Sequence, residues 1–140
     1  RRATALRVGV DAALAPEAAA DEILDATDGR GVDAVIEMAG TDAAIATAVA
    51  ASRPGARIAL GGIPSEDSSS FPAAAARRKG LTFAMVRRMN DTYRQAIELA
   101  TSGIDLDAIV SQRRPLTEAA DAFSSAAQRC GDKVVITVSG

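Results

Sequence analysis

The chain has 140 residues, a length typical of one domain, and 48% of them are hydrophobic, which is enough apolar material for a packed core. Its 16 basic and 18 acidic residues leave a net charge of −2, so composition gives no support for nucleic acid or an anionic membrane as a partner. One cysteine and no histidine exclude an internal disulfide and a Cys/His zinc site built from this sequence alone.

The first residues, Arg1-Arg2-Ala3-Thr4, carry no apolar segment of the kind found in signal peptides, and no apolar run approaches the roughly 20 residues that span a bilayer. We therefore predict a cytoplasmic protein. The sequence does not open on Met but on what reads as the tail of a helix that stops at Gly9. We expect it to be a fragment of a larger protein.

Short apolar runs alternate with helical patterns along the chain, which is typical of βαβ units and a parallel sheet. Few aromatic residues and many alanines favour close packing of helices on that sheet. Residues 12–14 form a first candidate strand. Pro16 favours the first position of a helix over residues 17–25.

Residues 27–40, with the sequence TDGRGVDAVIEMAG, join a glycine-broken helix end to a short apolar strand. The apolar run at residues 34–36 is typical of a parallel strand buried on both faces. Ligands of such sheets bind beyond the carboxyl ends of the strands. We therefore expect ligand contacts at Met38, Ala39 and Gly40.

Thr41 is a plausible N-cap for the next helix, which places residues 45, 48, 49 and 52 on one face. The segment Arg53-Pro54-Gly55 ends this helix, and residues 57–60 form the next strand. That strand runs into Gly61 and Gly62. Two adjacent glycines at the end of a strand allow the backbone to approach a ligand closely.

The rest of the chain continues the alternation. After a polar loop over residues 65–70, we expect a helix beginning near residue 73, a strand over 81–86, and a helix from about residue 91 that ends before Gly103. Residues 107–110 and 133–137 read as strands on either side of a further helix. The expected buried face of that helix consists of Leu116, Ala119, Ala120 and Phe123.

In chain order, several of these segments resemble the medium-chain, zinc-type alcohol and polyol dehydrogenases. The resemblance covers nearly the whole chain and rests on residues 9–11, 27–40, 53–56, 60–63, 103–105, 114–116 and 132–134. Residues 86–93, together with 109–111, are most similar to the branch of sorbitol and xylitol dehydrogenases.

The resemblance implies an α/β fold with a doubly wound, Rossmann-type parallel sheet and flanking helices. It identifies residues 1–140 as a single domain, the C-terminal portion of a dinucleotide-binding domain with the C-terminal helix and strand. The first two strands, the glycine-rich phosphate turn and the acidic residue for the adenosine ribose would precede Arg1. With strand order 3-2-1-4-5-6, their loss exposes one edge of the strand at residues 34–36, so we expect the chain to associate as a homo-oligomer.

By resemblance, cofactor contacts fall on Arg1 at the adenosine end, on Met38 and Ala39 near the adenine and ribose, and on Lys133 at the pyrophosphate. The backbone of Gly61, Gly62 and Ile63 would meet the nicotinamide carboxamide. For substrate, the resemblance implies Arg88. A guanidinium group suits this role because it binds hydroxyl or phosphate oxygens through paired donors. Met89 stands where relatives often have tyrosine.

Each of these residues also has a simpler interpretation, such as a solvated charge for Arg1, Arg88 and Lys133, or a plain turn for the glycine pair. We interpret Glu37 as structural, because a carboxylate at the end of a buried strand needs hydrogen-bond donors, and loop backbone can supply them.

The function implied is transfer of hydride between NAD, or NADP, and a polyol or secondary alcohol, with zinc bound by the full-length protein and not by this chain. The fragment alone would be inactive. Two alternatives stay open at the level of sequence. One is a zinc-independent quinone or enoyl reductase of the same superfamily, and the other is a non-catalytic binding or oligomerisation module.

Overall fold

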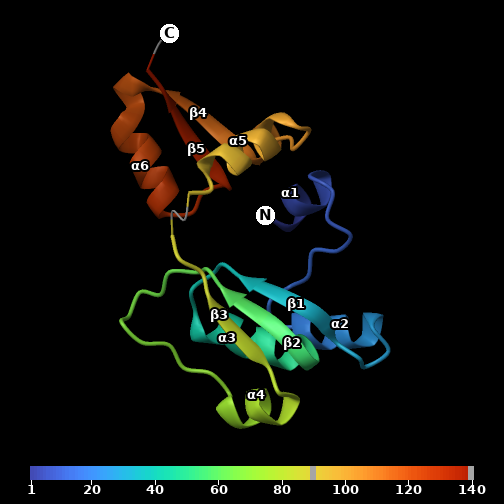
Figure 1. Cartoon of the computed structure of the whole chain (residues 1–140). Helices are drawn as coiled ribbons and strands as arrows, with labels where there is room; N and C mark the ends of the chain where they lie inside the picture. The colour runs from blue at the N-terminus through green and yellow to red at the C-terminus, as the bar shows by residue number, and fades with distance from the viewer. Residues whose placement is uncertain (89–90, 139–140) are drawn as a thin grey trace. The chain divides into compact units, whose positions relative to one another are not determined.

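Helices and strands alternate along the chain in the computed structural model, which describes residues 1–88 and 91–138 (Figure 1). Met89 therefore lies outside the described residues. The chain divides into two compact units. We call Leu14–Asn90 the three-stranded unit, and Arg1–Ala13 with Asp91–Gly140 the two-stranded unit.

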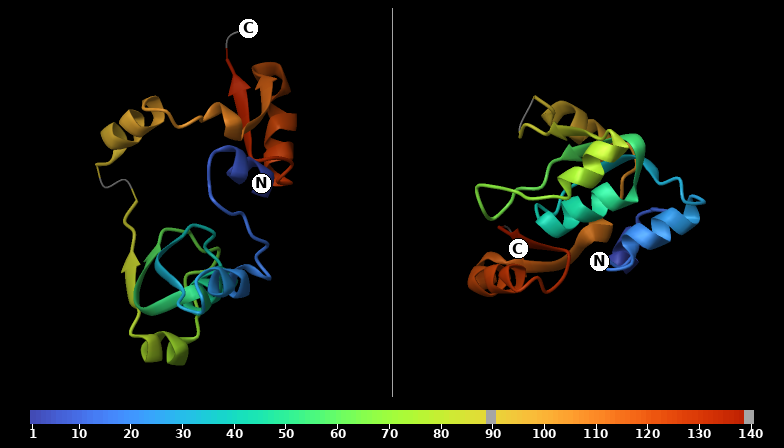
Figure 2. Two further views of the ribbon diagram at one scale, coloured as in Figure 1. Left: turned by 90° about the vertical axis from the view of Figure 1, so that its right-hand side faces the viewer. Right: turned by 90° about the horizontal axis from the view of Figure 1, so that it is seen from below.

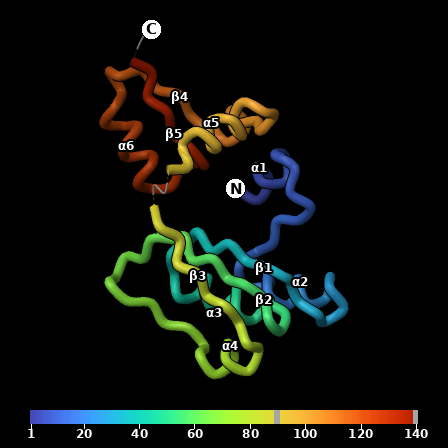
Figure 3. The backbone as a smooth tube through the Cα atoms, viewed as in Figure 1, coloured from blue at the N-terminus to red at the C-terminus, as the bar shows by residue number. Residues whose placement is uncertain are grey.

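The sheet of the three-stranded unit consists of β1 (Val32–Glu37), β2 (Ser52–Leu60) and β3 (Thr82–Met85), all parallel and in the order β1-β2-β3 (Figure 3). The strand predicted at residues 34–36 is therefore present and lies at an edge of its sheet, as expected. Its predicted burial on both faces is wrong. Side chains alternate between faces along a strand, so Val35 packs against the core while Ile36 points the other way and is 74% exposed.

Three helices, α2 (Ala19–Ala26), α3 (Asp42–Ala51) and α4 (Ala73–Lys79), complete this unit (Figure 2). Thr41 caps α3 as predicted, because its hydroxyl accepts the Ala44 N–H at 3.2 Å. The predicted inner face of α3 is also confirmed. Its residues Ile45, Ala48 and Val49 are buried and, with Ile58 of β2, account for much of the core.

Two predictions for the start of this unit are wrong. Residues 12–14 form no strand, since a strand needs a hydrogen-bonded neighbour and none of the described strands pairs with them. Pro16 does not begin α2. It lies instead in a turn closed by a hydrogen bond from Ala18 N–H to Ala15 O (3.1 Å), and the helix follows from Ala19.

The two-stranded unit contains β4 (Val110–Pro115) and β5 (Lys133–Thr137), which are parallel. Its helical elements are α1 (Arg2–Arg7), α5 (Tyr93–Thr101), the short 3₁₀ turns η1 (Asp107–Ile109) and η2 (Leu116–Glu118), and α6 (Ala119–Ala127). The strand predicted at residues 107–110 is wrong for its first three positions. Asp105 accepts the Ala108 N–H at 3.1 Å, which favours a tight turn there.

The predicted inner face of α6 is also wrong. Ala122 is buried (2% exposed), whereas Phe123 is 70% exposed. Leu116 belongs to the preceding 3₁₀ turn, so it does not share the phase of the helix. The side of α6 that meets β5 carries the small residues Ala122 and Ala126, which line a small hollow together with Val134.

Polar contacts attach α1 to the rest of the two-stranded unit. Thr4 Oγ1 donates to Asp132 Oδ2 at 2.6 Å, and Arg7 donates to the Ala108 carbonyl at 2.6 Å. Arg1 adds an ion pair with Asp132 at 3.6 Å. These contacts join the first helix to residues more than a hundred positions later in the sequence.

Among the helices of the described residues, none has both the length and the apolar character that crossing a membrane would require.

Candidate functional site

Two short segments meet where β1 and β2 end, at the carboxyl edge of the three-stranded sheet. Residues 38–40 follow β1 and residues 61–63 follow β2, and we call them together the strand-end platform. The N–H groups of Gly61 and Gly62 both donate to the main-chain oxygen of Glu37, at 2.8 and 2.9 Å. The platform thus contains five of the predicted cofactor-binding residues: Met38, Ala39, Gly61, Gly62 and Ile63.

Glu37 connects the two segments and is itself only 5% exposed. Its Oε1 accepts the N–H of Ala39 at 2.6 Å and the N–H of Gly40 at 2.7 Å. These are backbone donors of the following loop, so the structural role predicted for Glu37 is confirmed.

The glycines of the platform are required by contacts within the chain. A Cβ at Gly40 would lie 2.6 Å from the backbone carbon of Ile63, and Gly40 also has a φ of +69°. A Cβ at Gly62 would lie 2.6 Å from Glu37 Oε2 and would overlap the Gly40 backbone. From the sequence, we expected these glycines to allow close approach of the backbone to a ligand. In the structure, they allow close approach between the two segments of the platform.

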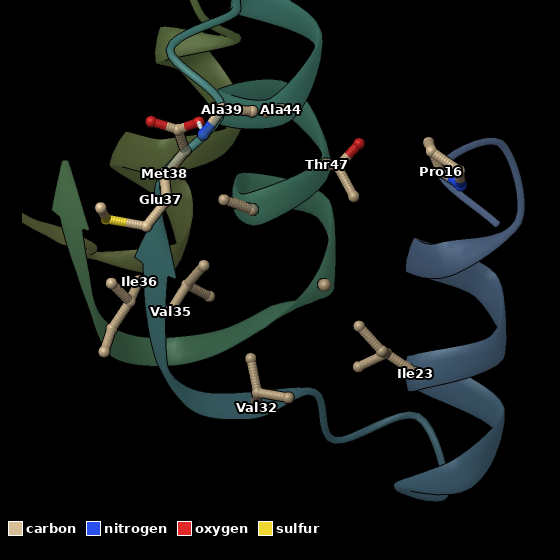
Figure 4. A pocket seen from close by; sticks show the side chains of 12 residues that line it. Pro16, Ile23, Val32, Val35, Ile36, Glu37, Met38, Ala39, Ala44 and Thr47 are labelled. Carbon is tan, nitrogen blue, oxygen red and sulfur yellow. Dashed lines mark hydrogen bonds between the residues drawn. The ribbon is translucent and has the colours of Figure 1, made fainter. Parts of the chain in front are cut away.

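An apolar cavity of about 310 Å³ lies beside the platform, between β1 and the helices α2 and α3 (Figure 4). This volume is at the lower end of the range of about 300–1,000 Å³ for small-molecule sites. Its polar components are Glu37 and Thr47, and the Thr47 hydroxyl is already used, since it donates to the Ala43 carbonyl at 3.0 Å. The cavity therefore suits a weakly polar group better than an ion.

Two exposed apolar side chains border the platform. Met38 is 69% exposed and Ile63 is 72% exposed. Met38 and Ala39 also line the cavity, and Figure 4 shows the Glu37 carboxylate next to the Ala39 nitrogen. Large apolar side chains left open to solvent beside a cavity are typical of a surface that contacts a ligand or partner.

The remaining predicted residues lie elsewhere. Arg88 follows β3 in the three-stranded unit and is exposed. Arg1 and Lys133 belong to the two-stranded unit, where both stand close to Asp132: Arg1 forms its ion pair with Asp132, and Lys133 is the next residue in the chain. The structure thus brings together the platform residues.

The strongest electrostatic perturbation lies at the opposite end of β1. Hydrogen bonds from Arg30 and from Arg53 hold the pKa of Asp33 at about 2, well below its usual value. This exposed cluster ties the entry of β1 to β2. Because it is at the amino end of the strand, it has no part in the platform.

The described residues contain no group of three or more His, Cys, Asp or Glu side chains that could hold a metal ion.

Residues 1–102 match the family model described as zinc-binding dehydrogenase. This chain belongs to the zinc-binding dehydrogenase family. A probable zinc-binding alcohol dehydrogenase of Mycobacterium tuberculosis is 36% identical over 121 residues, which are 85% of this chain and 32% of that protein. A sorbitol dehydrogenase of Bacillus subtilis is 32% identical over 111 residues, 79% of this chain and 31% of that protein.

Solved structures of the family have the same fold. An alcohol dehydrogenase from Thermus sp. ATN1 superposes with a TM-score of 0.73 at 28% identity, covering 86% of this chain and 35% of that one. The predicted fold class, an α/β Rossmann-type arrangement of parallel strands with flanking helices, is confirmed. This member of the zinc-binding dehydrogenases spans about a third of the length of the curated relatives it matches.

Sequence reasoning missed several residues of the cavity, chiefly Pro16 before α2, Ile23 within it and Thr47 on α3. Thr47 was detectable in principle, because it lies three residues after Ala44 and one turn before Ala51, which also line the cavity. Pro16 and Ile23 were not, since their position depends on how α2 packs beside α3.

Proposed function

We propose that the strand-end platform and its neighbouring cavity bind part of a nicotinamide dinucleotide, within a dehydrogenase that moves hydride between this cofactor and a polyol or secondary alcohol. The observation that carries the proposal is the strand-end platform, which lies at the carboxyl ends of two parallel strands, where ligands of open α/β sheets bind, and borders an apolar cavity that runs along β1. Membership of the zinc-binding dehydrogenase family supports the same function.

The proposed roles follow from the chemistry that each segment presents. Met38 and Ala39, beside the apolar cavity, would contact the adenosine end of the cofactor. Gly61, Gly62 and Ile63 would approach the nicotinamide through their backbone. Arg1 would contact the adenosine end of the cofactor and Lys133 its pyrophosphate, and we propose that the whole chain belongs to one dinucleotide-binding domain.

The cofactor, when bound, supplies hydride chemistry, and a zinc ion held by other parts of the protein would polarise the alcohol oxygen. This chain's own part is to bind and orient. Its residues keep the cofactor's flat rings against an apolar wall, and Arg88 would hold substrate hydroxyls through its planar set of donors. We propose NAD as the cofactor. None of the residues discussed above distinguishes NAD from NADP.

A matched pair of variants of the whole dehydrogenase tests the cofactor site. Ala39 and Ala74 are both exposed alanines, but Ala39 lines the cavity and Ala74 lies on α4. Ala39→Glu should weaken NADH binding by at least tenfold, about 1.4 kcal/mol, since a carboxylate would enter an apolar site beside Glu37. Ala74→Glu should leave it unchanged. Equal NADH affinity of the two variants, measured by fluorescence titration, would reject the site.

Substrate class is tested with Arg88. Arg88→Gln should raise KM for sorbitol and xylitol by about tenfold or more while NADH affinity stays the same, because the guanidinium would act on substrate alone. Arg87→Gln, a neighbouring exposed arginine, is the control. The turnover of sorbitol and xylitol should also be compared with that of simple secondary alcohols and L-threonine. If the polyols are turned over more slowly than these compounds, the proposed substrate class is wrong.

We also propose that the protein is a homo-oligomer. The open edge of β1 carries no strand within the described residues, and unpaired backbone groups of an edge strand favour association. Sedimentation of the purified protein over a range of concentrations measures this directly, and a monomer at every concentration would contradict it.

A further inference from the structure

Glu37 is a buried carboxylate that has no cationic partner among the described residues. It is 5% exposed and forms none of the ion pairs found in the described parts of the chain. Burial of a carboxylate is costly unless hydrogen bonds replace its hydration. For Glu37, backbone N–H groups alone provide these hydrogen bonds. The carboxylate can therefore be buried at low cost only while the loop keeps this conformation.

Glu37 accepts hydrogen bonds from both segments of the platform, through its side chain for one and its main chain for the other. Its side chain accepts from Ala39 and Gly40, which follow β1. Its main-chain oxygen accepts from Gly61 and Gly62, which follow β2. Every backbone donor at these four positions is therefore directed to Glu37.

This commitment of donors limits what the platform can offer a ligand. Each residue has a single backbone N–H, so a donor bonded to Glu37 is not available to a phosphate. A ligand at these positions meets carbonyl oxygens and side chains instead. The platform is thereby suited to neutral groups of the cofactor that donate hydrogen bonds, and it disfavours an anion beside a buried negative charge.

Steric contacts add a second constraint. A Cβ at Gly62 would come within 2.6 Å of Glu37 Oε2, and one at Gly40 would come within 2.6 Å of the Ile63 backbone. The carboxylate therefore fills the space between the two segments. If it were removed, the loop at residues 38–40 would lose both side-chain hydrogen bonds, and the packing of Glu37 Oε2 against Gly62 would be lost.

We propose that Glu37 is a positioning residue of the cofactor site, which fixes the spacing of residues 38–40 and 61–63 and thereby sets cofactor affinity. The proposal rests on the proposed cofactor site. Glu37 acts through the two loops and needs no contact with the cofactor itself.

The test compares three substitutions in the whole dehydrogenase. Glu37→Gln keeps an oxygen that can accept from Ala39 and Gly40, so NADH affinity should stay within about threefold of the parent. Glu37→Ala removes the acceptor and should weaken NADH binding by about tenfold or more. Glu37→Asp keeps the charge but withdraws the oxygens by one methylene, and should also weaken NADH binding by about tenfold.

Ser52→Ala is the matched control for stability. Ser52 is also a buried polar residue, 1% exposed, and its hydroxyl donates to the Ala48 carbonyl at 2.6 Å at the other end of β2. This variant should lower the melting temperature, while NADH affinity and kcat stay at parental values. A merely structural role of Glu37 would give the same pattern as Ser52→Ala.

The outcomes separate the two proposals. If the parent protein binds no NADH, the proposed cofactor site fails. If the parent binds and Glu37→Asp binds equally well, the positioning role is overturned, and Glu37→Asp decides the matter even if Glu37→Ala does not fold. Loss of affinity in Glu37→Ala and Glu37→Asp with rescue in Glu37→Gln supports the positioning role.

Discussion

The two units of the chain are built from similar elements but bury very different amounts of apolar surface. The three-stranded unit contains a continuous core around Ile58, Val49 and Ile45, each at most 3% exposed. In the two-stranded unit, Ala122 is the buried apolar residue among those described, and large side chains such as Ile97 and Phe123 are more than half exposed. Parallel strands and a packed helix therefore do not by themselves make a core.

The difference shows that the units are stabilised by different means. Removal of apolar surface from water stabilises the three-stranded unit. Specific polar contacts, such as those of Thr4 and Arg7, hold the two-stranded unit together. The exposed apolar side chains of α5 and α6 are typical of a surface that contacts a partner.

Truncation of core residues should distinguish the units most strongly. Ile58→Ala should lower the free energy of unfolding by about 2–5 kcal/mol, because it leaves a cavity beneath α3. Ile97→Ala, at a residue that is 62% exposed, should change it by no more than about 0.5 kcal/mol. Urea denaturation measures both, and similar losses in the two variants would mean that the units do not differ as described.

Lys79 offers a smaller test within the three-stranded unit. Its ammonium donates to the carbonyls of Val49, Ala50 and Ser52 at 2.7–2.9 Å, where α3 ends. Lys79→Met should lower the unfolding free energy by about 1–3 kcal/mol, since those carbonyls lose a charged donor at the negative end of the helix. The neighbouring Arg78→Met should have little effect, because Arg78 is exposed.

The equivalent test in the two-stranded unit should have a local effect. Thr4→Val removes the hydrogen bond to Asp132, so amide hydrogens of α1 should exchange faster while those of β2 keep their protection. Hydrogen exchange followed by mass spectrometry measures both segments in one experiment. Unchanged exchange in α1 would show that the Thr4 contact contributes nothing to its attachment.

The smallest expected effect is a dependence on pH at the entry of β1. Arg30 and Arg53 hold the pKa of Asp33 at about 2 in the folded chain, against a usual value of 3.8. A carboxyl whose pKa is lower in the folded state stabilises that state above its unfolded pKa. This stabilisation should fade as pH falls from about 4 to about 2. Asp33→Asn should remove that part of the acid dependence, which thermal melts at a series of pH values would reveal.

Much of the three-stranded unit could be predicted from the sequence, because its signals are local. Thr41 caps its helix by its own hydroxyl, and the apolar spacing of α3 identifies its inner face without knowledge of the fold. The role of Glu37 also followed from a local argument about burial. The platform residues could be named together because parallel strands end at the same edge of a sheet.

The errors occur where tertiary contacts decide. Ile36 looks buried by pattern, yet its exposure depends on whether a layer covers the second face of the sheet. Phe123 looks like a core residue of α6, but the helix packs through Ala122. Pro16 lies in a turn because of a hydrogen bond between its neighbours. The cavity lining was missed for the same reason, since Ile23 reaches it only through the packing of α2 beside α3.

The alanines between α3 and the sheet have a consequence for how such a site can evolve. Ala48, Ala51 and Ala56 are each less than 5% exposed, and at Ala56, which does not line the cavity, a larger side chain would force the helix and the sheet apart. Because only the N-cap Thr41 separates α3 from Gly40, such a displacement would carry the β1 loop away from Ile63. New specificities in directed evolution should therefore come from replacing outward-facing side chains such as Met38 and Ile63, while a library at Ala56 should return mostly the parental residue.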